Sequence, residues 1–126
     1  MSVSINDVVV AARQRIREVS PSEVEAVAPA DRVLIDVREP AEYASAHLPG
    51  AINLPRGVLE FQIHAHPAMG CSTSEALAAS DRPLVLYCLS GGRAALAADS
   101  LQQLGFSQVS SLAGGITAWR EAGLPV

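Results

Sequence analysis

The sequence predicts an α/β domain with a doubly wound, mainly parallel sheet and helices on both faces. Short apolar runs at residues 33–37, 51–54, 84–87 and 109–112 have the length and composition of buried strands. Segments of helical character alternate with these runs, and the connections between them are short. Hydrophobic residues make up 49% of the 126 residues, which is enough to bury one core of ordinary size.

Residues 1–19 are predicted to form an amphipathic helical extension before the domain proper at residues 20–126. The apolar residues that recur at helical spacing are Ile5, Val8, Val9, Ala12, Ile16 and Val19. We expect this stripe to pack on the chain's own core, and the main alternative is a second copy of the chain, as a homodimer. A new helix then begins at Ser20, because Pro21 and Glu23 complete the pattern of an N-cap with a capping box.

The remaining helices are predicted between the strands. The expected helices span residues 40–46, 93–104 and 116–122, and the second ends at Gly105. A helical turn is assigned to residues 57–63 and a further helix to residues 72–79. Residues 64–74 mix His, Pro, Gly and Ser without a period, so an irregular loop is expected there.

Charge and cysteine usage narrow the class of partner and the compartment. The formal net charge of −4 argues against a nucleic-acid partner, which would need a surplus of Lys and Arg. The two cysteines, Cys71 and Cys88, are too few for a disulfide scaffold and suit a reducing compartment. With no apolar run long enough for a signal peptide or a membrane span, we expect a cytoplasmic protein with no membrane partner.

The loop that begins at Cys88 carries the chemistry that the sequence predicts. Cys88 directly follows the strand at residues 84–87, and a helix starts five residues later, so backbone N–H groups can converge beside the thiol. Gly91 and Gly92 allow the backbone angles that such a loop needs. The positive end of the helix favours the thiolate form of Cys88, which makes it the predicted catalytic nucleophile. The expected anion-binding loop consists of Leu89, Ser90, Gly91, Gly92 and Arg93.

Four segments in order resemble the motifs of a single-domain rhodanese, a thiosulfate sulfurtransferase of the bacterial type. These segments are residues 36–43 (DVREPAEY), 47–55 (HLPGAINLP), 88–93 (CLSGGR) and 114–119 (GGITAW). The resemblance covers residues 20 to 126 and implies a rhodanese-like fold for that part of the chain.

The resemblance also implies a mechanism and a set of supporting residues. Cys88 would take the outer sulfur of thiosulfate or a similar small anion and pass it, as a persulfide, to cyanide, a thiol or an acceptor protein. Asp36, Arg38 and Arg93 would support the loop, with a carboxylate–guanidinium pair holding its shape. We expect a structural hydrogen-bonding role for His47. Neither a cofactor nor a metal ion is expected.

One position departs from the family pattern. Many relatives carry a basic residue directly after the nucleophile, whereas this chain has Leu89, so Arg93 is the only cationic side chain of the loop. This weakens the expectation of tight thiosulfate binding. An uncharged or protein-borne sulfur donor is the alternative.

Two other functions compete with sulfur transfer. A non-catalytic rhodanese-like binding or regulatory module is one, although Cys88 is present. The other is a cysteine-based phosphatase or arsenate reductase, whose loops resemble this one but hold seven residues, whereas Cys88 through Arg93 number six. Cys71 is expected to be an idle thiol, and His64, His66 and Cys71 lack an evident fourth ligand for zinc.

Overall fold

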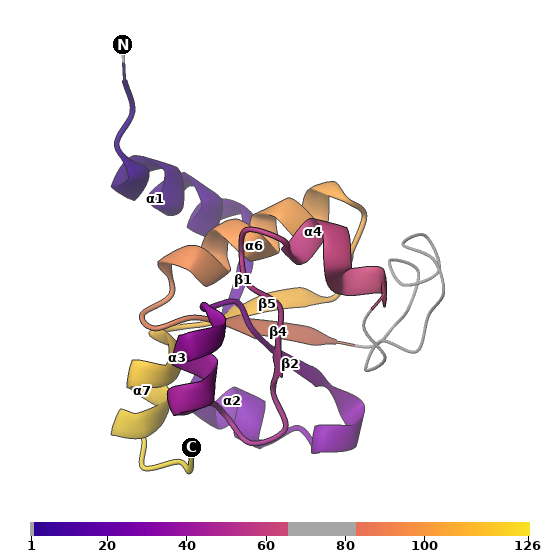
Figure 1. The fold of residues 1–126 in the computed structure, drawn as a ribbon. Coiled ribbons are helices and arrows are strands. Elements are labelled where there is room, and N and C mark those ends of the chain that lie inside the picture. The colour runs from indigo at the N-terminus through magenta and orange to yellow at the C-terminus, as the bar shows by residue number, and fades with distance from the viewer. Residues whose placement is uncertain (1, 66–82) are drawn as a thin grey trace.

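The computed structural model describes residues 2–65 and 83–126 (Figure 1). The helix predicted at residues 72–79, together with Cys71 and His66, lies outside the described residues. The helices and strands, in chain order, are α1 (Ile5–Arg15), β1 (Arg17–Val19), α2 (Pro21–Glu25), η1 (Pro29–Asp31), β2 (Val33–Asp36), α3 (Pro40–Ser45), β3 (Ile52–Asn53), α4 (Leu59–Gln62), η2 (Ile63–Ala65), β4 (Leu84–Tyr87), α6 (Gly92–Gln103), β5 (Val109–Leu112) and α7 (Gly115–Glu121).

The strands form one sheet in the order β1-β5-β4-β2-β3, and each neighbouring pair is parallel. β4 is central, and its Tyr87 is in register with Asp36 of β2. The carboxyl ends of these two strands therefore meet at the same edge, where open α/β sheets place their sites. The predicted α/β architecture is confirmed, and the strands and helices predicted after residue 32 and within the described residues lie within two residues of their expected bounds. Residues 64 and 65, predicted as part of an irregular loop, belong instead to the short 3-10 helix η2.

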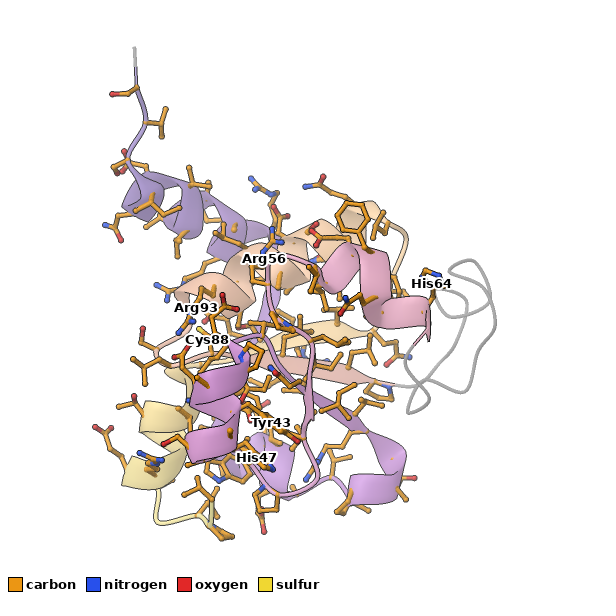
Figure 2. The ribbon with its side chains drawn as sticks, viewed as in Figure 1. Tyr43, His47, Arg56, His64, Cys88 and Arg93 are labelled. Atoms are coloured by element: carbon orange, nitrogen blue, oxygen red, sulfur yellow. The ribbon has the colours of Figure 1, made fainter. Side chains whose placement is uncertain are left out.

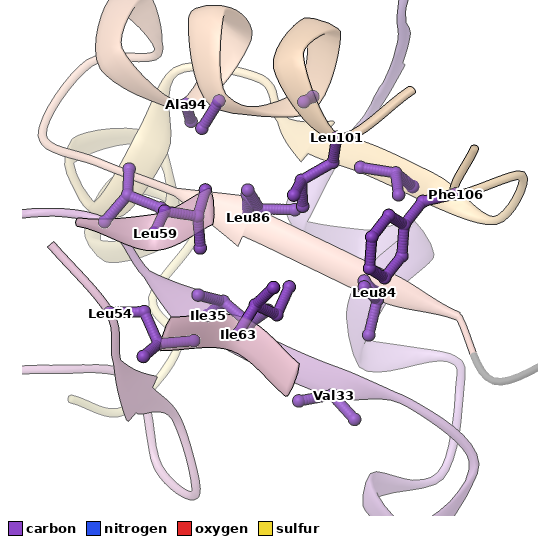
Figure 3. Close-up of a cluster of buried hydrophobic side chains, with 14 of the residues drawn as sticks. Val33, Ile35, Leu54, Leu59, Ile63, Leu84, Leu86, Ala94, Leu101 and Phe106 are labelled. Atoms are coloured by element: carbon purple, nitrogen blue, oxygen red, sulfur yellow. The ribbon is translucent and has the colours of Figure 1, made fainter. Parts of the chain in front are cut away.

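Helices cover both faces of the sheet. Figure 1 shows α1, α4 and α6 on one side and α2, α3 and α7 on the other. Alternate side chains of β2 and β4 enter the two cores, because successive strand residues point to opposite faces. Figure 3 shows the core under α4 and α6, where Ile35 and Leu86 meet Leu59 and Leu101. Burial on both faces explains why these strands are almost wholly apolar in sequence.

The N-terminal segment differs from the prediction. The helix expected through Val19 ends at Arg15, and Arg17–Val19 form β1, the edge strand paired with β5. Three residues are too few for a strand period to stand out from a helical one, so only the pairing with β5 decides their structure. Val9 and Ala12 are the buried residues of α1, which packs against α6 of the same chain.

An ion pair fixes the end of α1. Arg15 donates to both carboxylate oxygens of Asp99 on α6, at 2.9 and 2.7 Å. This contact lowers the pKa of Asp99 below its ordinary value.

Among the helices in the described ranges, none is long and apolar enough to cross a membrane.

Candidate active site

Cys88 lies at the carboxyl end of the central strand, directly after β4 (Figure 2). It is only 2% exposed and packs in the core beneath α6. Its Sγ accepts a hydrogen bond from the backbone N–H of Gly91 at 3.0 Å. A backbone amide of the predicted loop thus points at the predicted nucleophile, as an anion-binding loop requires.

Gly91 is the residue where the loop turns into α6. Its φ of 118° lies in the left-handed region, which a residue with a side chain would resist, and α6 begins at Gly92. The thiol of Cys88 therefore lies beside the amino end of a helix of 12 residues. The partial positive charge of that helix end therefore lies next to the sulfur.

The other side of the loop is held by the start of α7. Ile116 donates its backbone N–H to the carbonyl oxygen of Cys88 at 3.0 Å, and Thr117 donates its own to that of Leu89 at 3.2 Å. The hydroxyl of Thr117 donates to the same Leu89 oxygen at 2.9 Å. The loop therefore turns two carbonyl groups toward α7, and its Gly91 amide toward the sulfur.

Gly115 makes this close approach of α7 to the loop feasible. A Cβ atom at this position would stand 2.4 Å from the carbonyl oxygen of Cys88, and φ is 59°. The sequence singles out the motif at residues 114–119 only through its resemblance to a family, without a role for Gly115 or Thr117. Two glycines before a short helix were the available signal, but the loop that they contact lies about 25 residues earlier in the chain.

Arg93 links the Cys88 loop to α3 through an ion pair with Glu42. Its two terminal nitrogens donate to the two carboxylate oxygens of Glu42 at 2.8 and 3.1 Å, so the pair is bidentate. The hydrogen bond from Arg93 lowers the pKa of Glu42 to about 2. The same bond raises the pKa of Arg93. Glu42 was missed as a site residue, because no sequence spacing links it to a partner 51 residues away.

The predicted carboxylate–guanidinium pair is formed by Asp36 and Arg38, and both are buried. Arg38 donates to the carboxylate of Asp36 through Nε, at 3.0 and 3.2 Å, and through Nη2 at 2.8 Å. Burial opposes the charge of Arg38, yet the hydrogen bonds to Asp36 raise its pKa above the ordinary value. Nη2 also donates to the carbonyl oxygen of Ala46 at 2.6 Å. These contacts fix the segment that carries α3 and hence Glu42.

His47 takes part in packing beside α3. Its ring stacks on that of Tyr43 with the centroids 3.8 Å apart, and its Nδ1 lies 2.9 Å from the carbonyl oxygen of Tyr43. Figure 2 shows both side chains below Cys88 and at a distance from it, and His64 at the opposite end of the molecule. These contacts fit the structural role that the sequence predicts for His47.

A pocket of about 350 Å³ opens onto Cys88. Leu89, Ser90, Gly92 and Arg93 of the loop line it, and further wall residues come from α6 and α1. Leu89, which follows the nucleophile, is 50% exposed. The structure thus brings the predicted loop residues together around the sulfur. Asp36 and Arg38 do not line the pocket, and they contact each other and Ala46, which follows α3.

Comparison with known proteins identifies the family. The rhodanese-like domain family matches residues 20–122. A sulfurtransferase of Allochromatium vinosum is 36% identical over 96 residues, which are 76% of this chain and 78% of that protein. The thiosulfate sulfurtransferase GlpE of Stutzerimonas stutzeri is 32% identical over 104 residues, which are 82% of this chain and 84% of that protein.

A solved structure matches over the whole chain. It is a Rhodopseudomonas palustris protein of unknown function, described as a possible tyrosine phosphatase. The TM-score is 0.82 at 31% identity, and the match covers 100% of this chain and 96% of that one. The family match and the identity to the two sulfurtransferases lead to one conclusion: the chain belongs to the rhodanese-like domain family.

Proposed function

We propose that the protein is a sulfurtransferase that carries sulfane sulfur as a persulfide on Cys88, with thiosulfate or a similar compound as the donor. The observation that carries this proposal is the position of the Cys88 sulfur, 3.0 Å from the Gly91 amide at the start of α6. Relatives named sulfurtransferase and thiosulfate sulfurtransferase support the same class of reaction.

The reaction consists of two displacements at sulfur. In the first, the Cys88 thiolate attacks the outer sulfur of thiosulfate, and the bond between the two thiosulfate sulfurs breaks. Sulfite leaves with the electron pair of that bond, and the outer sulfur stays on Cys88 as a persulfide anion. In the second, an acceptor such as cyanide attacks the terminal sulfur, which gives thiocyanate and restores the thiolate. Charge and electrons balance in both steps.

The loop supplies the stabilisation that these steps need. Negative charge stays on sulfur before and after each displacement, and the Gly91 amide and the positive end of α6 favour it there. α7 and Glu42 hold the loop from two sides, so the amide is oriented before the donor arrives. Asp36 and Arg38 are positioning residues in this proposal, because they act through α3.

Loop length argues for a sulfur donor over a phosphate ester. Cys88 through Arg93 are six residues, one fewer than the loops of the cysteine-based phosphatases that the motif resembles. A shorter loop leaves less room inside the ring of amides for a tetrahedral phosphate. A non-catalytic module is the other alternative, and a buried cysteine hydrogen-bonded to its own loop argues against it.

Turnover of thiosulfate and cyanide tests the proposal. Wild type and the control Cys71→Ser should form thiocyanate, and Cys88→Ser should form none. The same three proteins should show no hydrolysis of p-nitrophenyl phosphate. Thiocyanate formation by Cys88→Ser, or phosphatase activity that depends on Cys88, would contradict the proposal. Inactivity of wild type with thiosulfate and with organic sulfane donors would favour the binding module.

A further inference from the structure

The apolar stripe of α1 extends past the helix on which it packs. Val9 and Ala12 are buried, and a Cγ atom of Val9 lies 3.8 Å from the point where a Cβ on Gly92 would stand. Val9 therefore covers the first residue of α6. Ile5 is one helical turn earlier on the same face, beyond the start of α6, and it is 68% exposed.

Because α1 extends beyond the start of α6, its side chains form part of the wall of the Cys88 pocket. Ile5 and Val9 line the pocket together with Leu89 of the loop and Leu96 of α6. Four aliphatic side chains from three segments thus surround the approach to the sulfur. Two of them, Ile5 and Leu89, are half exposed or more, so apolar surface is available for a ligand to cover. The volume of about 350 Å³ is at the lower end for small-molecule pockets, which fits a small ligand rather than a folded partner.

The charges around the pocket fit a ligand with a single negative charge. Among the lining residues that the structure describes, Arg93 alone carries a positive charge, and the bidentate contact with Glu42 already balances it. The guanidinium of Arg13 lies near Gly91, outside the pocket lining, and pairs with Glu18 at 3.9 Å. A dianion such as thiosulfate would therefore find one amide-lined point and little net positive charge. A monoanion with an aliphatic body would match both the charge and the apolar wall.

We propose that α1 is part of the donor site and selects organic sulfane sulfur compounds that carry an aliphatic body and one negative charge. This inference rests on the proposed sulfur transfer. The family match begins at residue 20, so the helix that supplies this wall lies outside the matched residues. In the loading step the Cys88 thiolate attacks the outer sulfur of the donor, R–SO₂–S⁻ in the case of a thiosulfonate. The sulfur–sulfur bond breaks, and the sulfinate R–SO₂⁻ leaves with its electron pair.

Alkanethiosulfonates from methane to hexane test the proposal, because they share the reacting group and the charge and differ only in the aliphatic body. We expect kcat/KM for thiocyanate formation with cyanide to rise about twofold to fourfold for each of the first added methylenes, as burial of a methylene in an apolar pocket predicts. Ile5→Ser and Leu89→Ser should flatten this dependence on chain length. The matched control is Val10→Ser, the same kind of aliphatic-to-hydroxyl change on the same helix, at a residue that is 47% exposed and outside the pocket lining.

The outcomes separate this inference from the proposed function. Equal kcat/KM for all chain lengths, or an unchanged dependence in Ile5→Ser, overturns the role of α1 while sulfur transfer stands. Failure of every donor to load Cys88 overturns the proposed function and this inference with it. Because Ile5 is largely exposed, the melting temperature of Ile5→Ser should equal that of wild type. If it does, a kcat/KM that is independent of chain length in this variant does not arise from misfolding.

Discussion

Backbone contacts hold the Cys88 loop from both sides. The sulfur accepts from Gly91 at 3.0 Å, and the carbonyl oxygen of Cys88 accepts from Ile116 at the same distance. Both donors are backbone N–H groups, so these contacts do not use the side chains of residues 91 and 116. What these positions require of the sequence is the absence of a side chain at the points of close approach, as at Gly115.

Gly115→Ala should show how much the loop depends on α7. The new Cβ would stand 2.4 Å from the carbonyl oxygen of Cys88, on a residue with a positive φ. We expect the free energy of unfolding to fall by about 2 kcal/mol and the rate of sulfur loading to fall with it. Gly57→Ala is the control, since a Cβ there would have no atom within 4 Å and the φ of Gly57 is not in the left-handed region. Urea unfolding and loading kinetics measure both effects, and equal stability of the two variants would refute the steric argument.

The ion pair between Glu42 and Arg93 should make a pH-dependent contribution to stability. The folded protein holds the pKa of Glu42 at about 2, below the ordinary 4.5. The pair therefore stabilises the fold at pH values above 4.5, and this stabilisation is lost as the pH falls from 4.5 to 2. Because both side chains are partly exposed, we expect a contribution of only about 0.5 kcal/mol at neutral pH.

Urea unfolding of wild type and Glu42→Gln at pH 7 and pH 3 measures this contribution. The difference between the two proteins should be present at pH 7 and smaller at pH 3. Glu121→Gln is the control, because Glu121 forms no ion pair with any described residue. A difference that stays constant between the two pH values would show that the pair is not what Glu42 contributes.

At this scale the sequence predicts contacts within a segment and misses those between segments. Cys88 and its loop are contiguous, so their arrangement follows from a strand, two glycines and a helix start. The pair of Asp36 with Arg38 also lies within one segment, although the sequence indicated it only through the family resemblance. Glu42 and Thr117 reach the loop from other elements, and only the folded sheet brings them there.

Among the elements, α1 and β1 show how tertiary contacts override a local pattern. The apolar spacing predicts one helix through Val19, and it is correct as far as Arg15. Beyond that residue the chain becomes the edge strand of the sheet, with Val19 in register with Leu112. Helices of a dozen residues, such as α6, are predictable because their period repeats several times, whereas a strand of three residues has no repeat.

The substitution Ala12→Leu tests the packing of α1 against α6. Ala12 is fully buried, so a larger side chain has to push the two helices apart. We expect the free energy of unfolding to fall by about 1–3 kcal/mol, and the preference for longer donors to weaken as Ile5 moves away from Cys88. Val10→Leu, at an exposed position of the same helix, should leave both unchanged. Chemical denaturation and donor kinetics of the two variants measure this, and equal behaviour would contradict the packing of α1 on α6.

At the scale of the whole molecule, the order of the strands in the sheet places the segments that form the candidate active site next to each other. β2 and β4 are neighbours and parallel, so the segment after Asp36 and the segment after Tyr87 leave the sheet side by side. One segment carries α3 with Glu42, and the other carries Cys88 with Arg93. The alternation of apolar runs and helices was enough to predict this architecture, because each strand is buried on both faces. The pattern does not fix the order of the strands, and only the folded structure shows it to be β1-β5-β4-β2-β3.

Mass spectrometry of the intact protein after incubation with a sulfane donor tests the central claim most directly. Wild type and Cys71→Ser should each gain the mass of one sulfur atom and lose it again on addition of cyanide, with one thiocyanate formed for each sulfur lost. Cys88→Ser should gain nothing. A stable sulfur adduct on Cys88→Ser, or no adduct on wild type from thiosulfate or from any alkanethiosulfonate, would contradict sulfur transfer through Cys88.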